Sequence, residues 1–338
     1  MNREQLNINF VPLENESHFI RYVESKLGNL TKGHGLLEWI EQIGNYMYVK
    51  TGQNKQEVNL KDYFGILKIG GCRFKKDLTV NAQLLVENAA FIIELKDYGQ
   101  NNDFRRQRFH LAHELAHVIF FDIRRVPIRS YDIFPPGSRE IEYLCNRIAR
   151  AILIPECVLS RKSERYAKPG DPEFHLGIIN KFCQDFRVPA NALLHRLVRD
   201  TGAWNCLVLR FIRFKDEDSV WRLKERYLPP KYWQNIKAFI PLEDLKKERT
   251  NPKRYPSAKG NLARHFESVC RFFNDEKENP EKMRRVTRQY PLSEIRGNPI
   301  DSFLNVYFTN DDLVTIHYSL GLDKFTKTWY LNVCIPLH

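Results

Sequence analysis

The stretch Arg108–Asp122, RFHLAHELAHVIFFD, places two histidines and a glutamate in the middle of a mostly apolar segment. The segment predicts a helix, and at 3.6 residues per turn His113 and His117 lie about 40° apart on one face. Glu114 lies at the edge of that face. Two interpretations follow from the pattern: a metal site with its own base, or two histidines packed in a core.

The metal interpretation requires a third ligand from another part of the chain. A catalytic zinc ion takes three protein ligands and leaves one position for water. His113 and His117 would supply two, and Glu114 would hold the water and accept its proton, which is the arrangement of the HExxH pattern. Five-residue matches also arise by chance, so the helical context and the third ligand matter.

Glu142 is the candidate for that third ligand. It lies in REIEYLCNRIARAILIP (residues 139–155), which predicts a helix that ends near Pro155, and it falls on the helix's inward-facing side. A loop of about twenty residues is long enough to fold this helix back onto the first. The alternative is a surface glutamate near a helix start, where acidic residues are common.

Length and composition limit the class of protein. The chain has 338 residues, which predicts more than one domain, and its 43% hydrophobic and 28% charged residues are typical of a soluble globular protein. No apolar run reaches the roughly 18 residues of a membrane span, and the N-terminus lacks the apolar core of a signal peptide. We therefore expect a cytoplasmic protein without a membrane partner. The seven cysteines form no CxxC pair, which indicates reduced thiols and excludes zinc-finger spacing.

The net charge of +12 favours a polyanionic partner. The densest basic run is KKERTNPKRYPSAK (residues 246–259). Basic residues interleaved with an aromatic ring suit single-stranded nucleic acid, because phosphates meet charge and bases stack on rings. The candidate contacts are Lys246, Lys247, Arg249, Lys253, Arg254, Tyr255 and Lys259. A solvated loop is the alternative interpretation.

Hydrophobic periodicity and turn residues divide the chain into helical and strand-like parts. Short strands are expected between residues 62 and 97, with a turn at Gly70–Gly71. The last third carries strand-like segments and one helix, so it predicts an α+β domain with its own core. Further helices are predicted at 15–30, 35–52, 174–186, 190–202 and 262–275, and C-terminal strands at 204–214, 219–228, 304–310, 313–320 and 328–336.

The helices at 174–186 and 190–202 have helix-turn-helix proportions, because only the turn RVP joins them. DNA binding is one interpretation of this pair. Plain packing is the alternative, since short helical hairpins are common and few of them bind DNA.

The two helical motifs together resemble the ImmA/IrrE family of bacterial and phage metallopeptidases. The family's usual form is R-x-F-x-x-A-H-E-x-G-H followed by E-x-x-A-N-x-F-A-x-x-L-L-x-P. This chain departs from it mildly, with Ala116 for glycine, Cys145 for alanine and Ile148 for phenylalanine. The resemblance covers about residues 60–200. The matching positions are Phe109, Ala112, His113, Glu114, His117, Glu142, Asn146, Ala149, Leu153 and Pro155.

The resemblance implies site residues and a fold. Zn²⁺ is the expected cofactor, with His113, His117 and Glu142 as ligands and Glu114 as the base. The expected fold class is α+β, with a mainly helical zincin-like metallopeptidase domain that includes a small sheet and then an α+β, GAF-like C-terminal domain. The expected divisions are 1–160 for the metallopeptidase domain, 161–202 for a helix-turn-helix-like segment and 203–338 for a sensor domain.

The resemblance also implies a substrate and a signal. Members of the family cleave a helix-turn-helix transcriptional repressor, which relieves repression of a stress, phage or mobile-element operon. Longer members linked to DNA damage or anti-phage defence respond to DNA, in some cases single-stranded. We therefore expect a repressor as substrate and single-stranded DNA as activator.

Two other classes of function stay open from the sequence. The chain could be a DNA-binding regulator with a structural zinc site, although a structural site gains nothing from a carboxylate such as Glu114 beside the metal. It could also be an antitoxin-like interaction partner with a vestigial site.

Cys72, in KIGGCRF, is a candidate inhibitory zinc ligand. A protease that cleaves a repressor must stay silent until it is signalled, and a thiolate could occupy the open zinc position. Cys72 follows two glycines that allow close backbone approach and precedes the helix of His113. The alternative is an ordinary packing residue.

Overall fold

The computed structural model describes most of the chain between residues 36 and 337. It describes residues 36–55, 57–88, 90–99, 104–119, 139–163, 166–171, 174, 177–214, 220–229, 258, 261–275, 284–292, 308, 312–323 and 328–337. None of the helices in these ranges is both long and apolar enough to cross a membrane. The predicted helix at 15–30 and the predicted strand at 304–310, apart from Phe308, lie outside the described residues.

The chain forms two compact units. The first comprises Met1–Lys162 and Phe182–Leu193, and the second comprises Ser163–Lys181 and Leu194–His338. The architecture is mixed α+β, with a helical region and a small sheet in the first unit and a larger antiparallel sheet in the second. The predicted division by function into 1–160, 161–202 and 203–338 stays a prediction.

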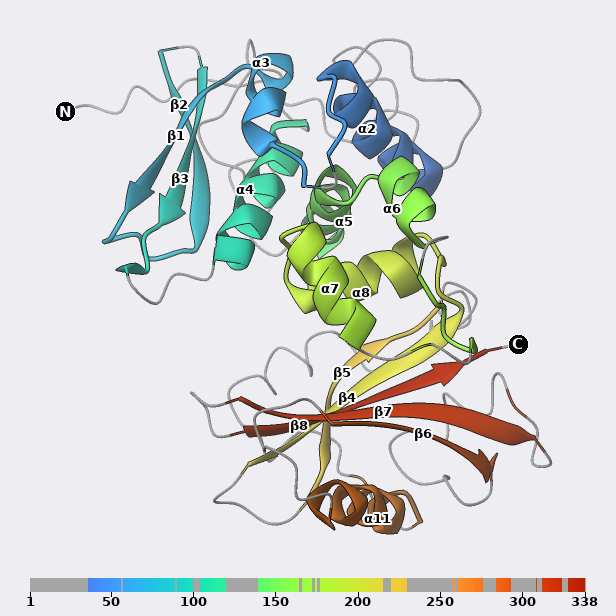
Figure 1. The fold of residues 1–338 in the computed structure, drawn as a ribbon. Helices are drawn as coiled ribbons and strands as arrows, with labels where there is room; N and C mark the ends of the chain where they lie inside the picture. The colour runs from blue at the N-terminus through green and yellow to red at the C-terminus, as the bar shows by residue number, and fades with distance from the viewer. Residues whose placement is uncertain are drawn as a thin grey trace. The chain divides into compact units, whose positions relative to one another are not determined.

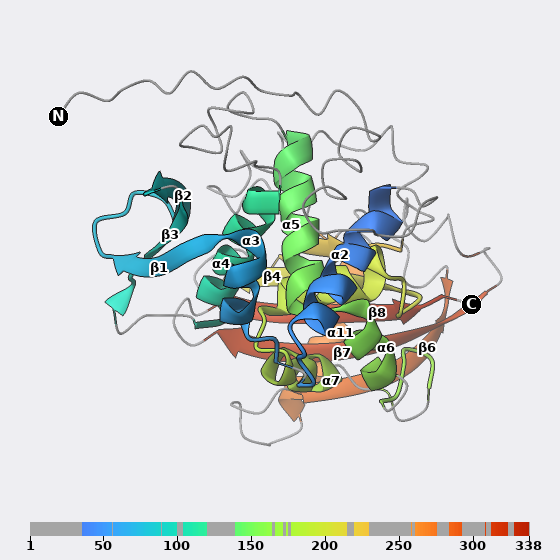
Figure 2. The same cartoon turned by 90° about the horizontal axis from the view of Figure 1, so that it is seen from above.

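Three helices form the centre of the first unit: α2 (Leu36–Lys50), α4 (Phe104–Ile119) and α5 (Arg139–Leu153). Figures 1 and 2 both show α5 between α4 and α2, and it packs against each of them. The α5 positions Cys145, Ile148, Ala149 and Ile152 are fully buried. Their spacing of three and four residues is the spacing of one helix face, which explains why this sequence forms a helix that packs on its neighbours.

Gly44 allows α2 and α5 to approach closely. A Cβ atom added at Gly44 would lie 2.4 Å from the backbone oxygen of Ala151. The two helix backbones are therefore in contact at this point, which fixes the position of α5 relative to α2.

The small sheet of the first unit has the order β1-β3-β2. β1 (Ile69–Lys75) pairs parallel to β3 (Ala90–Lys96), and β2 (Ala82–Glu87) pairs antiparallel to β3. α4 packs against β2 and β3. Ahead of the sheet come the 3₁₀ helix η1 (Leu60–Tyr63) and the short helix α3 (Phe64–Leu67), where a strand was expected.

The prediction of a turn at Gly70–Gly71 was wrong. Both glycines lie inside β1, where the register shifts between Ile69 and Gly71. A Cβ atom at Gly70 would lie 2.8 Å from the Cβ of Ala90. The glycine is therefore needed for a close approach between strands at an irregularity, which is a second common use of glycine in a sheet.

Two side chains at the beginning of α4 attach this helix to the rest of the first unit. Gln107 donates from Nε2 to the carbonyl oxygen of Lys96, at 3.0 Å, and Arg108 donates from an Nη to the carbonyl oxygen of Val58, at 2.8 Å. Because Lys96 ends β3, the Gln107 bond ties α4 to the sheet, and the Arg108 bond ties it to the segment before η1.

Four shorter helical segments follow α5. They are α6 (Glu156–Ser163), α7 (Gly177–Asp185), α8 (Ala190–Leu194) and the π-helical segment η4 (His195–Asp200). The two helices predicted around the RVP turn are present, and the second changes from α to π geometry after Leu194. Their use in DNA binding stays a prediction.

The second unit is built on a five-stranded antiparallel sheet with the order β5-β4-β8-β7-β6. The strands are β4 (Cys206–Phe214), β5 (Arg222–Tyr227), β6 (Arg284–Pro291), β7 (Leu313–Asp323) and β8 (Thr328–Pro336). Helix α11 (Asn261–Asp275) covers one face of the sheet (Figure 1).

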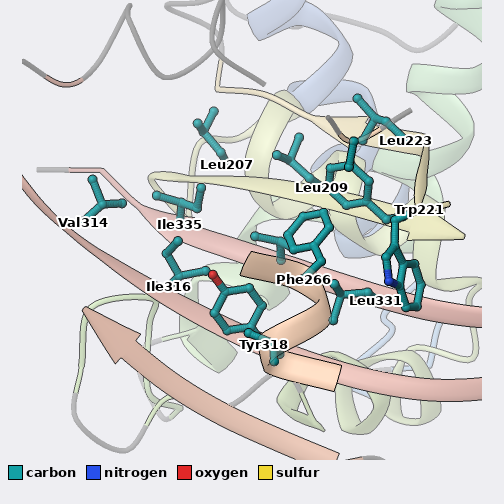
Figure 3. Packing of buried hydrophobic residues seen from close by; sticks show 14 of the residues in the cluster. Leu207, Leu209, Trp221, Leu223, Phe266, Val314, Ile316, Tyr318, Leu331 and Ile335 are labelled. Carbon is teal, nitrogen blue, oxygen red and sulfur yellow. The ribbon is translucent and has the colours of Figure 1, made fainter. Parts of the chain in front are cut away.

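The core of the second unit lies between α11 and the sheet. Alternate residues of β4, β7 and β8 point toward Phe266 of α11 (Figure 3). Phe266 also packs edge-on against Phe211 of β4. Alternation with a period of two is what places one set of strand residues on one face. The second unit therefore has its own hydrophobic core, as predicted for the last third of the chain.

Candidate metal centre

Helix α4 brings two imidazoles together. His113 and His117 lie one turn apart, and their Nε2 atoms are 3.0 Å from each other. The rings meet at an interplanar angle of 77°, so they share a contact point rather than stack. Both histidines are largely enclosed, because α4 buries Ala112, Leu115 and Ala116 against its neighbours.

Helix α5 places Glu142 against the same point. One carboxylate oxygen lies 3.3 Å from Nε2 of His113, and the other lies 3.5 Å from Nε2 of His117. The side chain of Glu142 is 57% exposed, whereas that of His117 is 4% exposed. The three groups thus form a cluster that is enclosed at His117 and open at Glu142.

The spacing of these donor atoms fits a tetrahedral metal ion. An ion bound tetrahedrally at about 2.0–2.1 Å from each ligand separates its ligand atoms by about 3.3 Å. The three measured separations of 3.0, 3.3 and 3.5 Å bracket that value. Among the described residues His113, His117 and Glu142 form the group whose donor atoms could hold a metal ion.

The charges of the cluster support the same use. Hydrogen bonds from His113 and then His117 hold the pKa of Glu142 well below its usual range, against a smaller opposing effect of burial. Burial, the largest single influence, lowers the pKa of His113, but the hydrogen bond to Glu142 and the charges of Glu114 and Glu142 together raise it above its ordinary value. Glu142 is therefore an ionised carboxylate at neutral pH, the form that binds a metal.

Glu114 lies beside the cluster but is not one of its three donors. It is buried, and burial raises the pKa of its carboxyl while the nearby His117 and His113 oppose that rise. A buried carboxylate next to two ligand histidines is in the position expected for a base. Its role as a base stays a prediction.

Cys145, which stands where the resembling motif has alanine, is a further residue of this site. Its Sγ lies 3.3 Å from Nδ1 of His117, on the side of the ring away from the donor cluster. Cys145 follows Glu142 by three residues on α5, so both lie on the same helix face. This three-residue spacing from Glu142 is the feature of the sequence from which Cys145 could have been predicted as a residue of the site.

Cys72 lies outside the donor cluster, and the basic run lies outside the described residues. Cys72 lies on β1, partly buried, and burial raises the pKa of its thiol while Lys61 opposes the rise. It is not in the group of converging donors. Lys246, Lys247, Arg249, Lys253, Arg254, Tyr255 and Lys259 all lie outside the described residues.

Two imidazoles from one helix and a carboxylate from the next form the His₂Glu donor set of catalytic zinc sites. Residues 98–198 match the family model of the IrrE N-terminal-like domain, Peptidase_M78. The chain therefore contains an IrrE N-terminal-like domain, and the matched residues include α4, α5 and all three donors. No match to a curated protein was found.

Proposed function

We propose that this protein is a zinc-dependent endopeptidase whose metal is held by His113, His117 and Glu142. The observation that carries the proposal is the convergence of these donors within 4.8 Å of one another, inside a Peptidase_M78 domain and beside Glu114. A structural zinc site is usually closed by four protein ligands, whereas three ligands leave a position for water.

Each residue then has a separate chemical task. Zinc, when bound, supplies Lewis acidity to a water molecule and to a peptide carbonyl. The two imidazoles and the Glu142 carboxylate hold the ion. Glu114 accepts the proton of the attacking water and returns it to the leaving amine, which is general acid–base catalysis by one carboxylate.

We further propose that the substrate is a helix-turn-helix transcriptional repressor and that its cleavage derepresses a stress or anti-phage defence operon. Single-stranded DNA is the proposed activator. The net charge of +12 supports a nucleic acid partner, and the second unit, with its own core, offers a separate place for a sensor of the GAF-like kind. Inhibition of the basal activity by Cys72 stays a prediction.

The test uses the full chain, with helix-turn-helix proteins encoded in its genomic neighbourhood as the candidate substrates. We expect one zinc ion per wild-type chain and cleavage of the repressor that single-stranded DNA increases. His117→Ala and Glu142→Ala should lose both metal and cleavage. Glu114→Gln should keep the metal and lose cleavage by at least about 100-fold, because general-base catalysis contributes about 10²–10⁴-fold.

The control is Glu156→Ala, which removes an acidic residue of α6 outside the donor cluster and should keep metal and cleavage. Metal content is measured by elemental analysis, and cleavage is measured by mass spectrometry of the products. Cleavage by Glu114→Gln at the wild-type rate would overturn the mechanism. Metal binding without any cleavage, with or without DNA, would favour a DNA-binding regulator or an antitoxin-like partner instead.

A further inference from the structure

The thiol of Cys145 contacts the one nitrogen of His117 that does not face the donor cluster. Its Sγ lies 3.3 Å from Nδ1, and the residue is fully buried. On the opposite side of the ring, Nε2 lies 3.0 Å from Nε2 of His113 and 3.5 Å from the Glu142 carboxylate. The ring of His117 is thus held between a sulfur atom and the metal position.

Because Nε2 of His117 faces the metal position, it determines which group donates and which accepts in the contact between Nδ1 and Cys145. A neutral imidazole that binds a metal through Nε2 keeps its proton on Nδ1, so Nδ1–H must donate a hydrogen bond. The sulfur of Cys145 is the acceptor that the structure provides. Ligand histidines in metal sites generally need such a partner, because it fixes the tautomer and the plane of the ring.

We propose that Cys145 is a positioning residue of the metal centre: its sulfur accepts a hydrogen bond from Nδ1–H of His117 and fixes that ligand for the metal. The inference rests on the proposed function, because it requires a metal at Nε2. It is specific to this chain, since the resembling motif has alanine here and a methyl group accepts no hydrogen bond.

The helix geometry gives this contact a second consequence. Glu142 and Cys145 lie one turn apart on α5, so a single rigid helix supplies both the third ligand and the partner of the second ligand. Any rotation of α5 that moved Glu142 away from the metal would also remove the acceptor from His117. The distances from Glu142 to the two histidines therefore depend on how α5 packs against α4, whereas the distance between His113 and His117 is set within α4.

Cys145 is not a fourth ligand in this arrangement. The thiol approaches Nδ1, and it is absent from the group of converging donors among the described residues. Burial raises the pKa of this thiol well above its ordinary value, and Glu142 and Glu114 add to the rise. A thiol sulfur is a weak hydrogen-bond acceptor, which suffices for the contact with Nδ1–H of His117.

The test compares the zinc affinity of the wild-type protein with that of Cys145→Ala and Cys145→Ser, by competition with a chromogenic chelator. We expect Cys145→Ala to weaken zinc binding about 10–100-fold, the usual effect of losing a partner of a ligand histidine. Cys145→Ser should recover part of the affinity, because a hydroxyl also accepts a hydrogen bond. Cys183→Ala, which removes another buried cysteine in α7, is the matched control and should leave zinc affinity unchanged.

Two spectroscopic readouts separate positioning from a purely structural role. In the zinc-loaded wild-type protein, ¹⁵N-labelled His117 should show a proton on Nδ1 that exchanges slowly with solvent, and Cys145→Ala should speed this exchange. The cobalt-substituted protein should show no thiolate-to-cobalt charge-transfer absorption. Such an absorption that disappears in Cys145→Ser would overturn the proposal, because it would make Cys145 a ligand.

Zinc affinity of Cys145→Ala equal to that of the wild type, in a variant that melts at the same temperature, would also overturn the proposal. If Cys145→Ala does not fold, the exchange rate of the Nδ1 proton in the wild-type protein decides the question, and fast exchange counts against the proposal. Failure of the wild-type protein to bind zinc would overturn the proposed function as well. Zinc binding that is insensitive to Cys145 would leave the proposed function intact.

Discussion

Glu114 and Glu142 are two carboxylates of the same centre with opposite environments. Glu142 is exposed and accepts hydrogen bonds from two histidines, which lower its pKa, whereas Glu114 is buried, which raises its pKa. Two carboxyl groups whose environments move their pKa values apart are suited to different roles in one site. These environments support the proposed roles, with the exposed, ionised Glu142 as a ligand and the enclosed Glu114 as a base.

His265 is a largely buried histidine of the second unit. It lies on α11 between Tyr318 of β7 and Tyr290 of β6, and its Nε2 is hydrogen-bonded to the Tyr318 hydroxyl. Burial, with a smaller effect from Arg288, lowers the pKa of His265 to about 4. The histidine is therefore neutral in the folded protein at neutral pH.

We predict that His265→Gln reduces the loss of stability of the protein in acid. The folded-state pKa lies below that of the unfolded chain, so the unfolded chain takes up the proton first as pH falls. The wild-type protein therefore loses free energy of unfolding as pH falls from about 6.5 toward 4, and the loss due to His265 is on the order of 3 kcal/mol. Urea unfolding from pH 7.5 to 4.5 measures it. The prediction would be contradicted if the free energy of unfolding changed with pH by the same amount in the wild-type and His265→Gln proteins over this range.

At the scale of single residues, the sequence predicted the donors well and their surroundings poorly. His113 and His117 follow from helix geometry alone, since four residues make slightly more than one turn. The prediction of Glu142 required an inference about which side of its helix faces inward, in addition to the family resemblance. Cys145 was missed because a lone cysteine in an apolar stripe is usually a packing residue, and only the ring orientation of His117 shows its sulfur to be a hydrogen-bond partner.

At the scale of helices and strands, the contact between α2 and α5 determines where Glu142 and Cys145 lie. Gly44 is at this contact, and an added Cβ would meet the backbone oxygen of Ala151 at 2.4 Å. Because a backbone atom cannot rotate away as a side chain can, the helices would have to separate.

We predict that Gly44→Ala destabilises the protein by about 1–3 kcal/mol through overpacking, even though alanine favours a helix by about 1 kcal/mol over glycine. It should also weaken zinc binding, because α5 moves. Gly65→Ala in α3 is the control: an added Cβ there meets nothing within 4 Å, so its effect should be neutral or slightly stabilising. Thermal melts and zinc titrations measure both effects. A Gly44→Ala protein as stable as the Gly65→Ala protein would contradict the argument.

Most regular elements were predictable from periodicity, and the exceptions have physical causes. In β7 and β8 the apolar residues that point into the core recur at every second position, and in α5 the apolar residues recur every three or four positions, so these elements were predictable. β6 was not predicted, because RRVTRQYP is rich in charge, as is common for a strand at the edge of a sheet. The glycine pair in β1 was mistaken for a turn because sequence does not distinguish a turn from a close contact between strands.

At the scale of the whole molecule, the net charge of +12 predicts binding to a polyanion. We predict that reversing the charges of Lys246, Lys247, Lys253 and Arg254 weakens binding of single-stranded DNA by the full-length protein. The difference from wild type should shrink as salt rises, because the lost contacts are to phosphate.

The measurement is fluorescence anisotropy of a labelled oligonucleotide at several salt concentrations. The control reverses Lys50, Lys61, Lys68 and Lys76, four lysines of the first unit, to the same net charge. Equal weakening by both sets would mean that only overall charge matters. Unchanged binding at low salt in the first set would mean that the basic run is a solvated loop.

The division of the chain into two units affects how the units can be exchanged by recombination during evolution. The chain passes from one unit to the other after Lys162, again after Lys181 and a third time after Leu193. Phe174, in the inserted segment, packs against Trp204 and against His317 of β7. A gene gains or loses a contiguous domain through one junction, but exchange of the second unit here would need three junctions at once. Recombination that joins residues 203–338 to another peptidase would leave behind Phe174, so the two units are expected to descend together rather than be shuffled separately.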